Sequence, residues 1–171
     1  VVIPHLDTKE DAEKAVRAVK YYPMGERGSN YGGGRNNDYG IGMSDVREYY
    51  EASNRETMVI ALIESEQAVE NIDEIVAVPG LDVGWLGPAD MAQSMGFPGQ
   101  SVVDEACDRV VEATIRAGKI AAIAHPPYNA IDTMSHYYDL GARMMSTGLL
   151  PFIKDGMAKW KADIKGLAAR G

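Results

Sequence analysis

The stretch that decides the fold is LDVGWLGPAD, from Leu81 to Asp90, taken together with VIALIE, from Val59 to Glu64. Each stretch is a short apolar run that ends at a carboxylate. Apolar runs of this length, bounded by turn residues, are typical of strands that are buried on both faces. Helical patterns lie between and after these runs, so the chain alternates strand and helix, as parallel βα units do.

The same alternation extends along the whole chain. Further strand-like runs are present at Val1 to Ile3, Ile120 to Ala124 and Arg143 to Ser146. This makes five expected strands, each followed by a helical pattern, and all of them parallel. A closed barrel of this type has eight βα units in about 250 residues. We therefore predict an α/β fold, a TIM (β/α)8 barrel, of which residues 1–171 form a single partial domain supplying about the last five βα units.

The expected helices follow from apolar residues at helical spacing and from their caps. They are expected after Thr8 to near Tyr22, and at Ser44 to Ala52, Ser65 to Val76, Val103 to Ile115, Ile131 to Leu140 and Leu150 to Leu167.

The segment from Gly25 to Gly42 contains seven glycines in eighteen residues, and we expect it to lack structure of its own. It is not a phosphate-binding P-loop, because no Gly-Lys-Ser/Thr follows it. Either its arginines, Arg27 and Arg35, bind a carboxylate or phosphate, or the segment is a surface loop that packs on a neighbouring subunit.

Composition limits the function classes. The chain has 171 residues, of which 46% are hydrophobic and 25% charged, with a net charge of −8. A negative chain is a poor partner for nucleic acids or anionic membranes, and no apolar run reaches the roughly 20 residues of a membrane span. The single cysteine, Cys107, excludes an internal disulfide framework and is expected to be buried. We expect a cytoplasmic protein.

Two carboxylates, Glu64 and Asp90, are expected at the carboxyl ends of neighbouring strands, where parallel sheets bind their ligands. Two hard oxygen ligands at one rim suit a Mg²⁺-type ion. Gly87 permits a close approach to the backbone and Pro88 fixes the turn before Asp90. The alternative for either carboxylate alone is a solvated loop residue or the start of a helix cap.

The chain resembles the HpcH/HpaI aldolases, the metal-dependent class II pyruvate aldolases of the phosphoenolpyruvate/pyruvate barrel superfamily. The matching motifs extend along almost the whole chain. They are VIPHLDTKEDAEKAV, YYPMGERG, VIALIES, LDVGWLGPADMAQSMG and GARMMSTG. The spacing of GPAD after IE is specific, whereas either motif alone is weak.

The resemblance implies roles for particular residues. Glu64 and Asp90 match the two metal-binding carboxylates, and the metal is expected to be Mg²⁺ or Mn²⁺, with Co²⁺ a further possibility. The residues expected to bind substrate are Gly87, Pro88, Ala89, Ala124 and His125.

One departure is that Leu62 stands where family members commonly carry a Gln. The catalytic His and the pyruvate-binding Arg of the family would lie before Val1, so we expect the N-terminal part of a larger domain to be missing here. His125 is the candidate within this chain for a catalytic role. His5, at a strand end, is a candidate for either a pocket residue or a residue that supports the site from behind, and His136 is expected at the surface or in packing.

The reaction implied by the resemblance is the reversible cleavage of a 4-hydroxy-2-oxo acid to pyruvate and an aldehyde through a metal-stabilised enolate, in the catabolism of aromatic compounds or sugar acids. The other aldolase strategy needs a Schiff-base lysine near the catalytic rim, and Lys119 instead precedes its strand.

Two alternatives stay open: a related lyase or decarboxylating C–C synthase that uses the same enolate, and a non-catalytic fragment that needs a partner for the first three βα units. Family members associate as dimers to hexamers, so the helix at about 150–167 is expected to exchange with a neighbouring subunit of a homo-oligomer.

Overall fold

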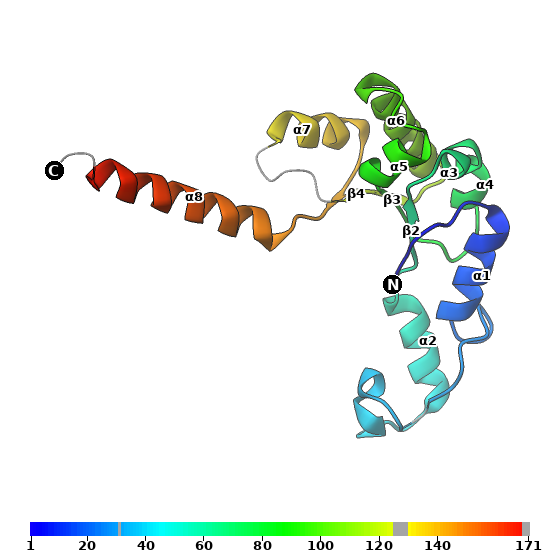
Figure 1. The fold of residues 1–171 in the computed structure, drawn as a ribbon. Coiled ribbons are helices and arrows are strands. Elements are labelled where there is room, and N and C mark those ends of the chain that lie inside the picture. Colours follow the sequence, from blue (N-terminus) through cyan, green and yellow to red (C-terminus); the bar gives the residue numbers. More distant parts are fainter. Residues whose placement is uncertain (31, 125–129, 169–171) are drawn as a thin grey trace.

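The computed structural model describes residues 1–30, 32–124 and 130–168, which form one parallel sheet with its connecting helices (Figure 1). In chain order the elements are β1 (Val2–Ile3), α1 (Lys9–Val19), the 3-10 helix η1 (Arg35–Gly40), α2 (Val46–Glu56), β2 (Ile60–Ile63), α3 (Glu66–Glu70), α4 (Ile72–Val76), β3 (Val83–Leu86), α5 (Pro88–Ser94), α6 (Gln100–Arg116), β4 (Ile120–Ile123), α7 (Ile131–Leu140), β5 (Met144–Met145) and α8 (Leu149–Ala168).

The sheet has five strands in the order β1-β2-β3-β4-β5, and every neighbouring pair is parallel. The register places Ile63 of β2 beside Leu86 of β3, and Leu86 beside Ile123 of β4. Spatial order therefore follows chain order, with helices after each strand, as in successive units of a (β/α)8 barrel. The predicted α/β class with parallel βα units is confirmed.

The two faces of the sheet are covered very differently. Alternate residues of a strand point to opposite faces. Ala61, Ile63 and Leu86 belong to the main core, which also contains the apolar faces of α1, α3, α4 and α6. On the opposite face the described residues form a small separate cluster of buried side chains, around Ile60 and Val83. The helices thus bury one face of the sheet and leave the other sparsely covered.

Local capping explains where several helices begin and end. The Thr8 side chain accepts the Asp11 N–H at the start of α1, and Asp45 caps α2 in the same way. Helix α6 ends at Ala117, followed by Gly118 with φ of +73°. Glycine adopts this left-handed conformation without the steric cost of a Cβ, which is why it commonly follows a helix cap.

Three expectations about local structure need correction. The helix expected from Ser65 to Val76 is two short helices, because the chain breaks at Asn71, whose side chain donates to the backbone oxygen of Asp7 at 2.9 Å. Helix α2 starts after its Asp45 cap rather than at Ser44, and it continues to Glu56. The glycine-rich segment is not wholly without structure, since it contains η1.

A buried lysine ties the amino ends of the strands together. Lys20 is 3% exposed, and its Nζ donates to the backbone oxygens of Asn54, at 2.7 Å, and Thr57. The same Nζ lies 3.9 Å from Oδ2 of Asp82, which accepts the Val59 N–H at 2.8 Å. Lys20 is fully engaged by groups from the end of α2 and the starts of β2 and β3.

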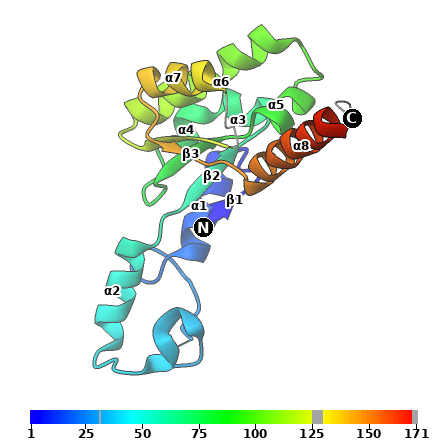
Figure 2. The same ribbon diagram turned by 90° about the vertical axis from the view of Figure 1, so that its left-hand side faces the viewer.

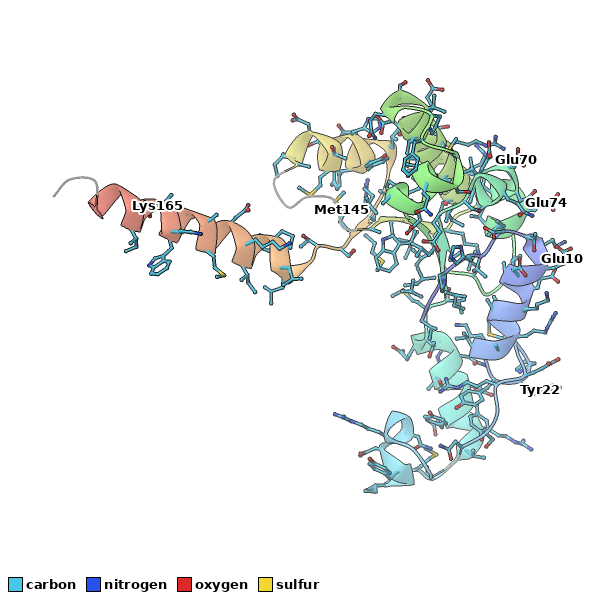
Figure 3. The ribbon with its side chains drawn as sticks, in the orientation of Figure 1. Glu10, Tyr22, Glu70, Glu74, Met145 and Lys165 are labelled. Atoms are coloured by element: carbon cyan, nitrogen blue, oxygen red, sulfur yellow. The ribbon has the colours of Figure 1, made fainter. Side chains whose placement is uncertain are left out.

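Two parts of the chain extend away from the sheet. Helix α2 and the loop before it project together from the body (Figure 2). Helix α8 projects on its own, with the Lys165 side chain near its end (Figure 3). All α8 residues from 149 to 166 are exposed. Within the described residues, no helix is long and apolar enough to span a membrane.

Candidate metal and substrate site

Three residues predicted for the site form a row at the carboxyl edge of the sheet. Glu64, Gly87 and Ala124 each follow the last residue of a strand, and those last residues are in register. The hydrogen bonds between the strands extend to these residues. The Gly87 N–H donates to Ile63 O at 2.9 Å, and the Ala124 N–H donates to Leu86 O at 3.1 Å. The three residues therefore lie side by side at this rim.

Glu64 is a buried carboxylate, 5% exposed. Its Oε1 accepts the backbone N–H of His5 at 3.1 Å and lies 3.5 Å from His5 Nδ1. A buried carboxylate is costly unless hydrogen bonds or a cation compensate it. Glu64 is therefore held in place where a bound cation would stabilise it further.

Gly87 lies against the Glu64 side chain. A Cβ atom added at Gly87 would lie 2.9 Å from Cβ of Glu64 and 3.3 Å from its Oε2. The 2.9 Å distance to Glu64 Cβ is too short for a side-chain carbon, so glycine allows Glu64 to lie against the neighbouring strand end without a shift. Gly87 was predicted to permit a close approach to its backbone, and the group that approaches it is the Glu64 side chain.

Asp90 comes from the next element. Pro88 occupies the first turn of α5, where its missing N–H costs nothing, and Asp90 lies in the same turn. Asp90 is exposed and lines the same cavity as Glu64. The fold thus brings both predicted carboxylates to one cavity.

That cavity has a volume of about 450 Å³. It is lined by Leu62, Glu64, Gly87, Pro88, Ala89, Asp90, Gln100, Asp104, Ile123, Ala124, Thr133 and Tyr137. The predicted metal-binding and substrate-binding residues within the described part of the chain are all included, whereas His5, a candidate pocket residue, does not line the cavity. His125 was also predicted to line the pocket, and it lies outside the described residues.

Sequence reasoning missed the polar residues that α6 and α7 contribute to this cavity. Gln100 and Asp104 lie in the first turns of α6, and Thr133 lies in the first turn of α7. In a parallel βα unit the helix after a strand begins at the strand's carboxyl end, next to the ligand site. A polar residue in the first turn of the helix after a predicted strand was the available signal for Thr133, whereas Gln100 and Asp104 lie beyond the intervening α5.

Tyr137 of α7 is buried and is one of the residues that line the cavity. Burial, together with the neighbouring Cys107 thiol, raises the pKa of Tyr137 far above its usual range. Burial also raises the pKa of Cys107 to about 11. Both groups stay neutral near pH 7, so Tyr137 can donate a hydrogen bond but is not a base.

The donor set suits a hard divalent cation. Among the described residues no group of three or more His, Cys, Asp or Glu side chains could hold a metal ion by itself. Two carboxylates in one cavity suit an ion such as Mg²⁺, which commonly takes one or two protein carboxylates and fills its remaining positions with substrate oxygens and water. Glu64 and Asp90 fit that requirement.

Fold and site together define an α/β protein of the parallel barrel type, with a carboxylate-lined cavity at the carboxyl ends of its strands. The chain belongs to the HpcH/HpaI aldolase/citrate lyase family, whose model matches residues 1–150. The resemblance inferred from the motifs is confirmed.

Two relatives carry aldolase names. The hydroxypyruvate/pyruvate aldolase of Delftia acidovorans (strain DSM 14801 / SPH-1) is 35% identical over 152 residues, which cover 87% of this chain and 54% of that protein. The 4-hydroxy-2-oxovalerate aldolase of Novosphingobium aromaticivorans is 35% identical over 179 residues, covering 100% of this chain and 64% of that protein. The chain thus spans just over half to just under two thirds of these two relatives.

Solved structures share the fold. An HpcH/HpaI aldolase/citrate lyase family protein from Burkholderia cenocepacia J2315 aligns with a TM-score of 0.83 at 27% identity, over 96% of this chain and 64% of that one. The citrate synthase SbnG aligns with a TM-score of 0.81 at 26% identity, over 98% of this chain and 63% of that one.

Proposed function

We propose that the protein is a metal-dependent aldolase that reversibly cleaves a 4-hydroxy-2-oxo acid to pyruvate and an aldehyde. The observation that carries the proposal is the convergence of Glu64 and Asp90 on one cavity beside Gly87, at the carboxyl edge of a parallel sheet. The names of the relatives support the substrate class, a 2-oxo acid.

The proposed roles follow from the geometry of the rim. Glu64 and Asp90 hold Mg²⁺ or Mn²⁺, and Co²⁺ would suit the same oxygen ligands. A bound divalent cation supplies Lewis-acid stabilisation of the negative charge that develops on the 2-oxo oxygen. Gly87, Pro88 and Ala89 line the cavity at the start of α5 and seat the pyruvate carboxylate.

Other residues of the cavity orient the substrate and exclude water. Ala124 and Ile123 give an apolar wall beside the rim, against which the methyl carbon of pyruvate packs. Tyr137 lines the same cavity, and we propose its neutral hydroxyl as a hydrogen-bond donor to the substrate. Together they orient the methyl group for proton transfer while the carboxylate is held at Gly87.

The base and the pyruvate-binding arginine are proposed to come from the further βα units of a complete barrel. The sparsely covered face of the sheet supports this, since Ile120 is 42% exposed there and the described residues form a small cluster around Ile60 and Val83. Strands β1 and β5 are both edge strands, and natural proteins normally cover or pair such edges. We propose that additional strands close the sheet in the native protein.

We further propose a homo-oligomer in which α8 packs on a neighbouring subunit. Leu150, Ile153, Met157, Trp160 and Ile164 are all exposed and alternate at three- and four-residue spacing. That spacing puts them along one side of the helix, in a narrow seam that typically packs against another helix.

The test is exchange of the pyruvate methyl protons with solvent deuterium, followed by NMR, with Mn²⁺ and then with EDTA. This measurement detects proton abstraction next to the 2-oxo group, and it does not require that the aldehyde substrate be known. We expect exchange with Mn²⁺ and its loss with EDTA. Exchange that persists in EDTA would contradict a metal-dependent site.

A second candidate function is a lyase or C–C synthase that uses the same activated pyruvate unit on another electrophile. The similarity to the citrate synthase SbnG favours it. Product analysis with a panel of aldehydes and 2-oxo acids separates the two functions, because an aldolase releases an aldehyde from a 4-hydroxy-2-oxo acid and a synthase does not.

A further inference from the structure

His5 lies beside Glu64 at the rim, although the two are far apart in the sequence. Both the backbone N–H and the imidazole Nδ1 of His5 face the same carboxylate oxygen, Oε1, at 3.1 Å and 3.5 Å. The imidazole is 71% exposed, whereas Glu64 is 5% exposed. The part-buried backbone hydrogen bond is therefore the shorter and more directional part of the interaction.

The backbone of His5 is in an unusual conformation. Its φ is +51°, in the left-handed region that costs most non-glycine residues about 1–2 kcal/mol. Histidine is enriched there several-fold among non-glycine residues. A conformation of this kind persists only where the surroundings determine it, and such residues cluster at functional sites.

The surroundings of His5 do determine it. After His5 the chain turns to Asp7, whose carboxylate accepts a hydrogen bond from the Ser65 hydroxyl. The backbone oxygen of Asp7 also accepts the Asn71 amide at 2.9 Å. The loop from β1 to α1 is thus fastened to the residue that follows Glu64 and to the break between α3 and α4.

These contacts give the two oxygens of Glu64 different roles. Oε1 is engaged by the His5 amide, while Oε2 lies against Gly87, at 3.3 Å from where a Cβ would be. Second-shell hydrogen bonds of this kind orient metal-ligating carboxylates.

We propose that His5 is a positioning residue for the Glu64 carboxylate. Its left-handed backbone directs the amide at Oε1, which leaves Oε2 to bind the cation, and the imidazole is not required. This inference rests on the proposed metal site.

The test is Mn²⁺ affinity, measured by EPR titration of the full-length protein without substrate, for a series of His5 variants. His5→Gly keeps the left-handed conformation and removes the imidazole. His5→Val disfavours that conformation through its β-branched side chain. We expect wild-type affinity for His5→Gly and a loss of about tenfold or more for His5→Val, the usual range for an outer-shell partner.

Controls separate the possible failures. If Glu64→Gln leaves Mn²⁺ affinity unchanged, the proposed metal site is wrong. If Glu64→Gln weakens binding but His5→Val does not, only the role of His5 is wrong. Weak binding by His5→Gly would also contradict the proposal, since it would assign the effect to the imidazole. Should His5→Val not fold, His5→Ala replaces it, with an affinity expected below that of His5→Gly.

Discussion

The amino ends and the carboxyl ends of the strands form two opposite edges of the sheet, and each contains a buried charged side chain. The two charges differ in how completely they are compensated. At the amino edge, Lys20 is surrounded by two backbone oxygens and the Asp82 carboxylate. At the carboxyl edge, Glu64 has one oxygen engaged by His5, and its side chain lines an open cavity. A charge whose partners are complete contributes to stability, whereas a charge facing a cavity remains available to a ligand. The amino edge of such barrels generally serves stability and the carboxyl edge binds ligands.

The largest expected effect is at the carboxyl edge. Glu64→Gln and Asp90→Asn should each lower Mn²⁺-dependent exchange of pyruvate methyl protons by about 100-fold or more, at least the loss seen for outer-shell partners. The free energy of unfolding should change little, because Gln and Asn keep the size of the side chains. NMR exchange rates and urea denaturation measure the two quantities, and the exposed Glu70→Gln is the matched control. Exchange at the wild-type rate in both site variants would place the metal elsewhere.

Substitution at the amino edge should have the reverse effect, a loss of stability without a loss of metal affinity. Lys20→Met leaves the backbone oxygens of Asn54 and Thr57 without their donor, which should lower the free energy of unfolding by about 2–4 kcal/mol. Urea denaturation measures the loss, and Mn²⁺ affinity of the folded protein should stay unchanged. Lys14→Met, on the exposed side of the same helix, is the control, with an expected change within about 0.5 kcal/mol. Equal stability of the two variants would contradict the structural role of Lys20.

A pair of glycines on β3 and just after it sharpens the comparison. A Cβ at Gly87 would press on Glu64, and a Cβ at Gly84 would lie 2.5 Å from Thr114 Oγ1, on the helix-covered face. Both alanine variants should lose about 1–3 kcal/mol of stability from overpacking. Only Gly87→Ala should also weaken Mn²⁺ binding, by about tenfold, because it moves a proposed ligand. Calorimetric titration of both variants checks this, and equal affinities would remove Gly87 from the site.

The smallest effect is expected in the layer between sheet and helices. Burial raises the pKa of Cys107 to about 11, from 9.0 for an unperturbed thiol. Between these values the unfolded chain has lost the proton that the folded protein keeps, so stability should fall as pH rises from about 9 to 11, by about 2 kcal/mol. Urea denaturation across this range measures the slope, and Cys107→Ala should reduce it. An equal slope in the variant would assign the pH dependence to other groups.

Much of the fold could be predicted because its signals are local. Four-residue apolar runs such as Val83–Leu86 form the strands, with their residues on the helix-covered face fully buried, and the helical stripe around Val110 matches a buried face of α6. Capping residues such as Thr8 determine helix starts. Local signals did not show the break at Asn71, because its cause is a hydrogen bond to Asp7, which is distant in sequence.

The same distinction between local signals and long-range contacts applies to the candidate site. Glu64 and Gly87 lie at the ends of predicted strands and Ala124 is the last residue of another. Parallel strands in sequential order place their ends side by side, so the sequence sufficed to group these residues. Asp104 and Thr133 reach the same cavity from two helices whose relative placement depends on packing.

By itself, the sequence determined the strand and helix order, the parallel sheet and the row of residues at its carboxyl edge. Each of these depends on residue type and spacing over a few positions. Only the tertiary structure decided that His5 adopts a left-handed backbone against Glu64, and that the partners of Lys20 come from α2 and the start of β3. Those contacts join residues 30 or more positions apart, and they form only when packing of the whole core brings the segments together.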